Sequence, residues 1–247
     1  SKVGREKENG YFYIDIGNLY VGVRLYKSAN SYYKKAIDIF EKQQNADGLS
    51  TSYTCYAFAS QYAKDFDTAI KYAKLAFEVH KKKEQNQFSK AYQYFVLGMA
   101  LKAANQLQEA KQQYRKAIDL FADSSFVTDK SYNELRMFPA NNALELVQIY
   151  NKEQKIDSAL YYFQLTQNLV LKHNVSDPAF DLHLQRTEMN CLSVQKKYAA
   201  AIKLANELIK KYVTTPSAEI IPQYQYAILR DVAEVYATVG DSAKMYE

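Results

Sequence analysis

The chain has 247 residues and a net charge of +5, and 48% of its residues are apolar. This is enough apolar material for one or two folded domains. Only 7 glycines and 4 prolines are present, which is too few turn-forming residues for an all-β or doubly wound α/β protein. The composition therefore predicts an all-α protein with about eleven helices and no strand.

One pattern of small and aromatic residues recurs along the chain. A large apolar residue is followed by a small one, and three residues later by an aromatic residue or leucine. Alanine, an aromatic residue and a second alanine follow at spacings of nine, four and three. The clearest copy consists of Leu97, Gly98, Leu101, Ala110, Tyr114 and Ala117. In chain order the six copies cover approximately residues 10–46, 47–86, 87–122, 131–174, 177–213 and 216–247, and the last copy is incomplete.

Each copy is expected to form a pair of antiparallel helices. Residues three and four positions apart share one face of a helix. A small residue such as Gly17, Gly98 or Ala233 lets two helix backbones approach each other, and the aromatic residue of the copy fills the space beside it. One helix pair cannot bury its apolar face alone, so the pairs should stack into a single array over residues 1–247.

Several residues indicate where helices begin. Ser50 and Ser89 are acceptable N-caps, and Asp177–Pro178 places a capping carboxylate before a proline at the first helical position. Thr215–Pro216 is a similar signal. Phe138–Pro139 either opens a helix or kinks one that begins earlier, and the sequence leaves both alternatives open.

The pattern resembles the tetratricopeptide repeat (TPR) family over nearly the whole chain, from about Gly10 to Glu247. The distance between equivalent alanines is near forty residues, longer than the family's usual period of about 34. Such long-period repeats look like those of bacterial sensor and regulator proteins. The resemblance implies a right-handed superhelix of about five to six antiparallel helix pairs, which holds a protein or an extended peptide in its concave groove.

The residues give little sign of catalytic or metal-binding chemistry. The only three histidines, His80, His173 and His183, form no metal-binding motif, and the scattered glycines build no phosphate-binding loop. Cys55 and Cys191 lie far apart and are expected to be buried thiols. We therefore expect no enzyme activity, no cofactor and no metal.

Nucleic acid and membrane partners are also not expected for this segment. Lysine runs such as 81–83 and 210–211 close predicted helices, where positive charge favours the helix C-terminus. No apolar run approaches the length of a membrane span. The expected partner is a protein or an extended peptide.

In TPR proteins the first helix of each pair lines the groove, and the resemblance carries this role to specific positions here. Amide side chains there offer both a donor and an acceptor to a peptide backbone. Arg186 or Arg230 would bind a carboxylate, and the aromatic residues would take apolar side chains. The alternative is that these residues are solvated helix faces. The candidate groove residues are Tyr11, Asn18, Phe58, Tyr62, Tyr92, Met99, Lys102, Asn141, Gln148, Asn151, His183, Arg186, Asn190, Arg230 and Glu234.

The resemblance favours a non-catalytic sensing or interaction segment of a larger signal-transduction or transcription-regulating protein. The chain stops within a helical pattern at residues 242–247, which is why a longer parent chain is expected. The alternatives are a scaffold for assembling protein complexes and a cytoplasmic receptor for peptide pheromones. The compartment is unknown from the sequence, and an extracytoplasmic segment of a membrane-anchored regulator is favoured over a cytoplasmic one. The carboxylate clamp of chaperone-binding relatives is absent, since the matching positions hold Ile14 and Asn18, Cys55, then Tyr92 and Val96.

Overall fold

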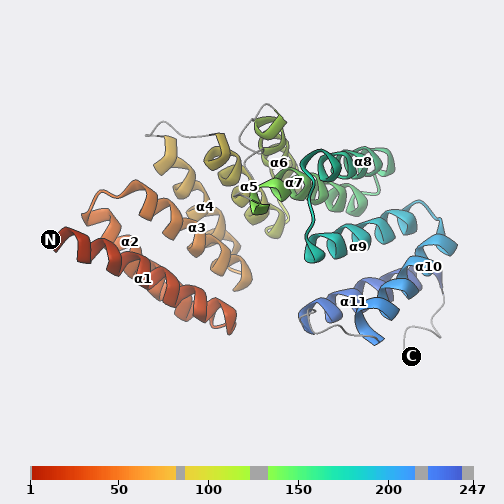
Figure 1. Ribbon diagram of the computed structural model, residues 1–247, viewed down its shortest axis with the longest axis horizontal. Helices are drawn as coiled ribbons and strands as arrows, with labels where there is room; N and C mark the ends of the chain where they lie inside the picture. The colour runs from red at the N-terminus through yellow and green to blue at the C-terminus, as the bar shows by residue number, and fades with distance from the viewer. Residues whose placement is uncertain (1, 82–86, 123–132, 215–221, 241–247) are drawn as a thin grey trace. The chain divides into compact units, whose positions relative to one another are not determined.

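A computed structural model describes residues 2–81, 87–122, 133–214 and 222–240, and all regular structure in these ranges is helical (Figure 1). The predicted all-α class is therefore confirmed. The chain divides into two compact units, residues 1–127 and 128–247. The predicted single array across both units remains a prediction.

The first unit consists of three helix pairs, one for each of the first three sequence copies. Neighbouring helices pack against each other in chain order, and the first helices of successive pairs also meet, α1 with α3 and α3 with α5. The helices are α1 (Lys2–Gly22), α2 (Tyr26–Lys42), α3 (Ala46–Tyr62), α4 (Phe66–Lys81), α5 (Gln87–Ala103) and α6 (Leu107–Ala122).

The second unit repeats this plan. Here α7 contacts α9 and α9 contacts α11, so the first helices of successive pairs again lie side by side. The helices are α7 (Asn133–Lys152), α8 (Ile156–His173), α9 (Pro178–Val194), α10 (Tyr198–Ile209) and α11 (Pro222–Val239), and a π-helical segment, Lys210–Thr214, extends α10. No helix of the described residues is both long and apolar enough to cross a membrane.

The pairing of small and aromatic residues explains how the helices approach each other. A Cβ atom added at Gly17 of α1 would overlap the ring of Tyr33 on α2, and one added at Gly98 of α5 would lie 2.8 Å from the Tyr114 ring on α6. Both tyrosines are fully buried. The prediction that Gly17 and Gly98 face a neighbouring helix is therefore confirmed, whereas Ala233 on α11 is only half-buried.

The predicted helix starts were right in one case and wrong in two. Asp177 caps α9, accepting a hydrogen bond of 2.7 Å from the Phe180 amide. Ser50 and Ser89 lie inside α3 and α5, and the side chain of Asn45 caps α3 instead. Ser50 accepts a buried hydrogen bond of 3.2 Å from the Gln93 side chain of α5.

The two remaining helix-start signals predicted from the sequence contain prolines. α7 already begins at Asn133, so Pro139 lies inside a helix and does not open one. Thr215–Pro216 lies outside the described residues.

Each of the five complete helix pairs uses the same turn. Its central residue adopts a left-handed conformation although it is not glycine. In the α3–α4 turn the Lys64 amide donates to the Gln61 carbonyl at 3.0 Å and the Asp65 amide to the Ser60 carbonyl at 2.9 Å, which satisfies the end of the first helix. The left-handed residues are Arg24, Lys64, Asn105, Gln154 and Lys196.

Replacing Lys64 by glycine is expected to raise the free energy of unfolding by up to about 1 kcal/mol. The left-handed conformation costs a Cβ-bearing residue about 1–2 kcal/mol, and the greater chain entropy of glycine offsets part of the gain. Urea unfolding followed by circular dichroism measures the change. Asn105→Gly is the matched control, with a smaller gain because asparagine tolerates this conformation better. A loss of stability in Lys64→Gly would contradict the turn geometry.

Candidate functional site

The polar side chains predicted for the second half of the groove lie on the neighbouring helices α7, α9 and α11. Four of them, Gln148, Asn151, His183 and Arg186, take part in side-chain contacts between these helices. Gln148 of α7 lies 2.7 Å from the imidazole Nε2 of His183 on α9, a hydrogen-bond distance. Arg186, one helical turn further along α9, reaches Asp231 of α11. The structure therefore brings a row of predicted residues together within the second unit.

Asn151 is the most deeply placed of these amides. Its Nδ2 atom donates to the Cys191 sulfur on α9 at 3.3 Å, and both residues are buried. Burial raises the pKa of the Cys191 thiol, while the hydrogen bond with Asn151 lowers it by a smaller amount. The amide of Asn151 thus joins α7 to α9 beneath the surface.

A buried carboxylate holds two arginines at the α9–α11 contact. Arg186 donates to Asp231 Oδ2 from Nε at 2.9 Å and from Nη2 at 2.5 Å. Arg230 donates to Oδ1 of the same carboxylate at 3.1 and 2.8 Å. The Asp231 side chain is 7% exposed, whereas that of Arg230 is 57% exposed. Two guanidinium groups share the Asp231 carboxylate, Arg230 faces solvent, and the exposed Glu234 one turn further along α11 also interacts electrostatically with Arg230.

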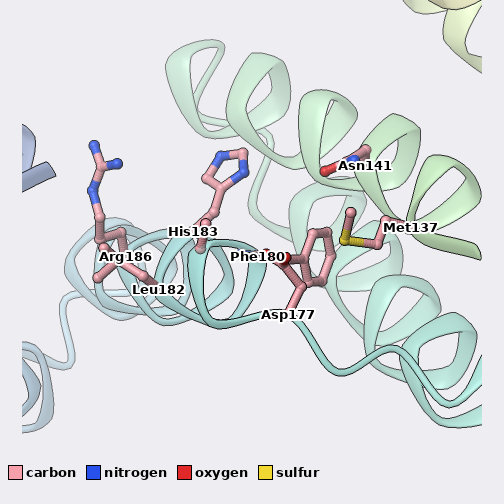
Figure 2. A pocket seen from close by; sticks show the side chains of 8 residues that line it. Met137, Asn141, Asp177, Phe180, Leu182, His183 and Arg186 are labelled. Atoms are coloured by element: carbon pink, nitrogen blue, oxygen red, sulfur yellow. Dashed lines mark hydrogen bonds between the residues drawn. The ribbon is translucent and has the colours of Figure 1, made fainter. Parts of the chain in front are cut away.

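A cavity of about 340 Å³ opens beside this row, between α7 and the first half of α9 (Figure 2). In Figure 2 the Phe180 ring lies near Met137 of α7, and His183 and Arg186 project from the same side of α9. The cavity therefore has an apolar part next to polar and basic side chains. It is lined by Met137, Asn141, Asp177, Ala179, Phe180, Leu182, His183 and Arg186.

The structure also places the remaining candidates of the second unit. Asn190 is half-buried on α9, and Glu234 is exposed on α11. Sequence reasoning found Asn141, His183 and Arg186 but missed the apolar lining and Asp231. Asp231 directly follows a candidate arginine, but no sequence spacing relates it to Arg186.

The aromatic candidates of the first unit are mostly packed against neighbouring rings. Tyr11 meets Phe40 edge-on with 4.9 Å between ring centroids, and the exposed Tyr62 stacks on Tyr26 at 5.7 Å. Burial raises the pKa of Tyr92 to about 12, so this phenol stays neutral at physiological pH. These rings contribute chiefly to packing between helices.

The other candidates of this unit are polar or half-buried. Asn18 is exposed and accepts a hydrogen bond of 2.8 Å from the Tyr33 hydroxyl. Phe58, Met99 and Lys102 are half-buried on α3 and α5. Within the described parts of the chain, no group of three or more His, Cys, Asp or Glu side chains is arranged to hold a metal ion.

Comparison with solved structures identifies the fold class. The chain is similar to a signal transduction ATPase with a tetratricopeptide repeat sensor from Pyrococcus horikoshii, at 16% identity and a TM-score of 0.66, over 97% of this chain and 35% of that one. It is also similar to kinesin light chain TPR-like repeats from Podosopora anserina, at 16% identity and a TM-score of 0.56, over 79% of this chain and 89% of that one. The apo form of RapI matches at 14% identity and a TM-score of 0.59, over 96% of this chain and 66% of that one.

Because the sequence identities are low, these similarities show the fold alone. The chain has the TPR-like fold that its sequence pattern predicted. No family model matches the sequence, and no curated protein matches it.

Proposed function

We propose that the chain is a non-catalytic protein-interaction module that binds an extended peptide across α7, α9 and α11. The observation that supports this most directly is the cavity beside Phe180 together with the arginine pair on Asp231. The cavity offers space for one apolar side chain of the peptide. The largely exposed Arg230 guanidinium offers a place for a carboxylate at the neighbouring part of the peptide.

The polar lining suits a peptide backbone. An extended peptide has N–H and C=O groups that must find partners when water is removed. Asn141 at the cavity and Gln148 beside His183 carry amides with both donor and acceptor atoms. Such side chains bind a backbone without reading its sequence, so specificity would come from the apolar cavity and the exposed Arg230.

Arg230 is the residue best suited to meet the peptide carboxylate. Asp231 already binds Arg186 through two nitrogens and holds that side chain in place. Arg230 binds the other carboxylate oxygen and remains largely exposed. An incoming carboxylate can bridge to Arg230 without breaking the Arg186 pair, and charge-assisted hydrogen bonds of this kind are the stronger class.

We expect Arg230→Gln to weaken binding of an acidic peptide about tenfold, which corresponds to about 1.4 kcal/mol. A panel of labelled peptides that combine one large apolar residue with an aspartate or a free C-terminus is screened by fluorescence anisotropy. Asn141→Phe, which places a large ring in the cavity lining, should abolish binding of the same peptides. Lys203→Gln, on the exposed face of α10, is the matched charge control and should leave affinity unchanged.

Two results would contradict this site. If Arg230→Gln and Asn141→Phe both bind as the parent chain does, the peptide binds elsewhere. If acidic peptides bind the parent chain no more tightly than they bind the Arg230→Gln variant, as expected for neutral peptides, Arg230 does not bind the peptide carboxylate.

Within this proposal, the module serves as the sensing or interaction segment of a larger signalling or transcription-regulating protein. The tetratricopeptide repeat sensor of the Pyrococcus horikoshii protein supports this idea, and the present chain spans about a third of that protein. In the alternative of a peptide-pheromone receptor, the ligand would be a short free peptide. A scaffold would instead bind folded proteins and ignore every peptide of the panel.

A further inference from the structure

A tyrosine and a residue on the facing helix recur at matching positions in the three helix pairs of the first unit. Both positions are counted from the left-handed residue of the turn between the two helices. Eleven residues before it, on the first helix, the three pairs have Tyr13, Tyr53 and Tyr94. Eleven residues after it, on the second helix, they have Lys35, Leu75 and Lys116. The middle pair therefore has leucine where the first and third pairs have lysine.

In the first and third pairs the lysine covers the tyrosine ring. The Lys35 ammonium lies 5.6 Å from the centre of the Tyr13 ring, and the Lys116 ammonium lies 5.5 Å from the centre of the Tyr94 ring. An ammonium group at this distance is attracted by the negative face of the ring. Each lysine is followed three residues later, on the same helix face, by a carboxylate, Asp38 and Asp119 respectively. Both pairs thus combine a ring, a cation and a carboxylate.

The middle pair keeps the ring and the carboxylate but has no lysine at this position. Glu78 follows Leu75 by three residues, as the aspartates follow the lysines in the other two pairs. At this place a cavity of about 830 Å³ opens between the start of α3 and the end of α4. Tyr53 and Leu75 both line it, and Leu49 and Val79 extend its apolar wall. The cavity therefore lies beside the position where the other pairs carry a cation.

The charged groups that line this cavity are acidic. Asp47 and Glu78 are both exposed at its surface, and no basic side chain is among the described residues that line it. A third carboxylate, Glu41 of α2, accepts a hydrogen bond of 3.2 Å from the Tyr53 hydroxyl. Glu78 also lines an adjoining cavity along α4, so it shares its charge with the lysines there, Lys71 and Lys74. An apolar wall with an acidic rim matches a long side chain that ends in a positive charge.

We propose that this cavity binds a lysine side chain of a partner polypeptide. The methylene stem packs on Leu49, Leu75 and Val79, and the ammonium group lies between Asp47 and Glu78. The partner thereby supplies the cation that the first and third helix pairs carry within themselves. This site lies in the first unit and uses none of the residues of the peptide site proposed on α7, α9 and α11.

Saturation-transfer NMR with Nα-acetyl-lysine methylamide tests the site, because the method detects weakly bound small molecules. The neutral norleucine analogue of this probe has the same alkyl stem without the ammonium group. The parent chain should bind the lysine probe about fivefold more tightly than the norleucine probe, the upper end of what an exposed ion pair contributes. High salt should remove this difference, since it screens exposed charges.

Leu75→Lys is the sharpest variant, because it gives the middle pair the lysine of its neighbours. It should keep the helix content in circular dichroism and lose the preference for the lysine probe, since its own ammonium group occupies the site. Leu75→Met is the matched control, which keeps an apolar wall and should bind as the parent chain does. Lys74→Gln should strengthen binding of the lysine probe, because it removes a cation that shares Glu78.

The double variant Asp47→Asn with Glu78→Gln tests the acidic rim independently of Leu75. It should bind the lysine probe about fivefold more weakly than the parent chain and leave the norleucine probe unaffected. Equal binding of the two probes by the parent chain overturns the proposal. Undiminished binding of the lysine probe by a folded Leu75→Lys variant also overturns it. If that variant does not fold, undiminished binding by the Asp47→Asn, Glu78→Gln variant has the same consequence.

Discussion

Replacing Gly17 by leucine is expected to lower the free energy of unfolding of the first unit by about 2–3 kcal/mol, the upper part of the usual range for overpacking. Any side chain at this position would occupy the space of the Tyr33 ring, which is fully buried between α1 and α3. Moving the ring aside would disturb its buried contacts and the hydrogen bond from its hydroxyl to Asn18. Urea unfolding followed by circular dichroism measures the loss.

Gly22→Leu is the matched control, because Gly22 lies on the same helix with nothing within 4 Å of an added Cβ. It should leave stability within about 0.5 kcal/mol of the parent chain, as surface substitutions usually do. A double-mutant cycle with Tyr33→Ala identifies the cause. Shortening Tyr33 should cost less in the Gly17→Leu background than in the parent, since the two side chains compete for one space. Additive losses would show that Gly17 is not limited by this ring.

Replacing Asp231 by asparagine is expected to cost about 2 kcal/mol of stability in the second unit. The change removes the shared negative charge and leaves the mostly buried Arg186 without a counter-ion. Removing one partner of a fully buried ion pair costs about 3–5 kcal/mol, and the partial exposure of this cluster reduces the penalty. Thermal and urea unfolding of the variant measure it.

Arg230→Gln is the comparison that makes this prediction specific. The Arg230 side chain is more than half exposed, and Asp231 keeps its bond to Arg186 when Arg230 is lost. Exposed ion pairs contribute about 0–1 kcal/mol, so the loss should stay within that range. Equal losses in the two variants would contradict the asymmetry between a buried carboxylate and an exposed guanidinium.

The two cysteines of the chain are free thiols, and burial affects the reactivity of Cys55. Burial raises the pKa of the Cys55 thiol to about 11, so it remains protonated and weakly nucleophilic at neutral pH. Neither Cys55 nor Cys191 forms a disulfide. The sequence predicted two buried thiols, and this holds for Cys191, whereas Cys55 is half-buried.

The sequence correctly predicted features that depend on residues close together in the chain. The spacing of small and aromatic residues repeats within one helix pair, so Gly17 and Gly98 could be matched to Tyr33 and Tyr114 from the chain alone. The Asp177 cap is equally local, since it binds an amide three residues away. Ser50 is not the N-cap because Asn45, five residues earlier, already caps α3. Gly48, inside the helix, then leaves space for the Phe40 ring.

The sequence by itself determined the all-helical class, the repeated helix pair and the TPR-like fold, because contacts between residues three and four apart encode them. It also predicted polar groove residues on α7, α9 and α11, and this remains a prediction. Only the tertiary structure decided which of these residues act together. The Arg186–Asp231 pair, the Asn151–Cys191 contact and the cavity beside Phe180 join residues from different helices. Their distances depend on how neighbouring helices pack, and no periodicity along the chain records that.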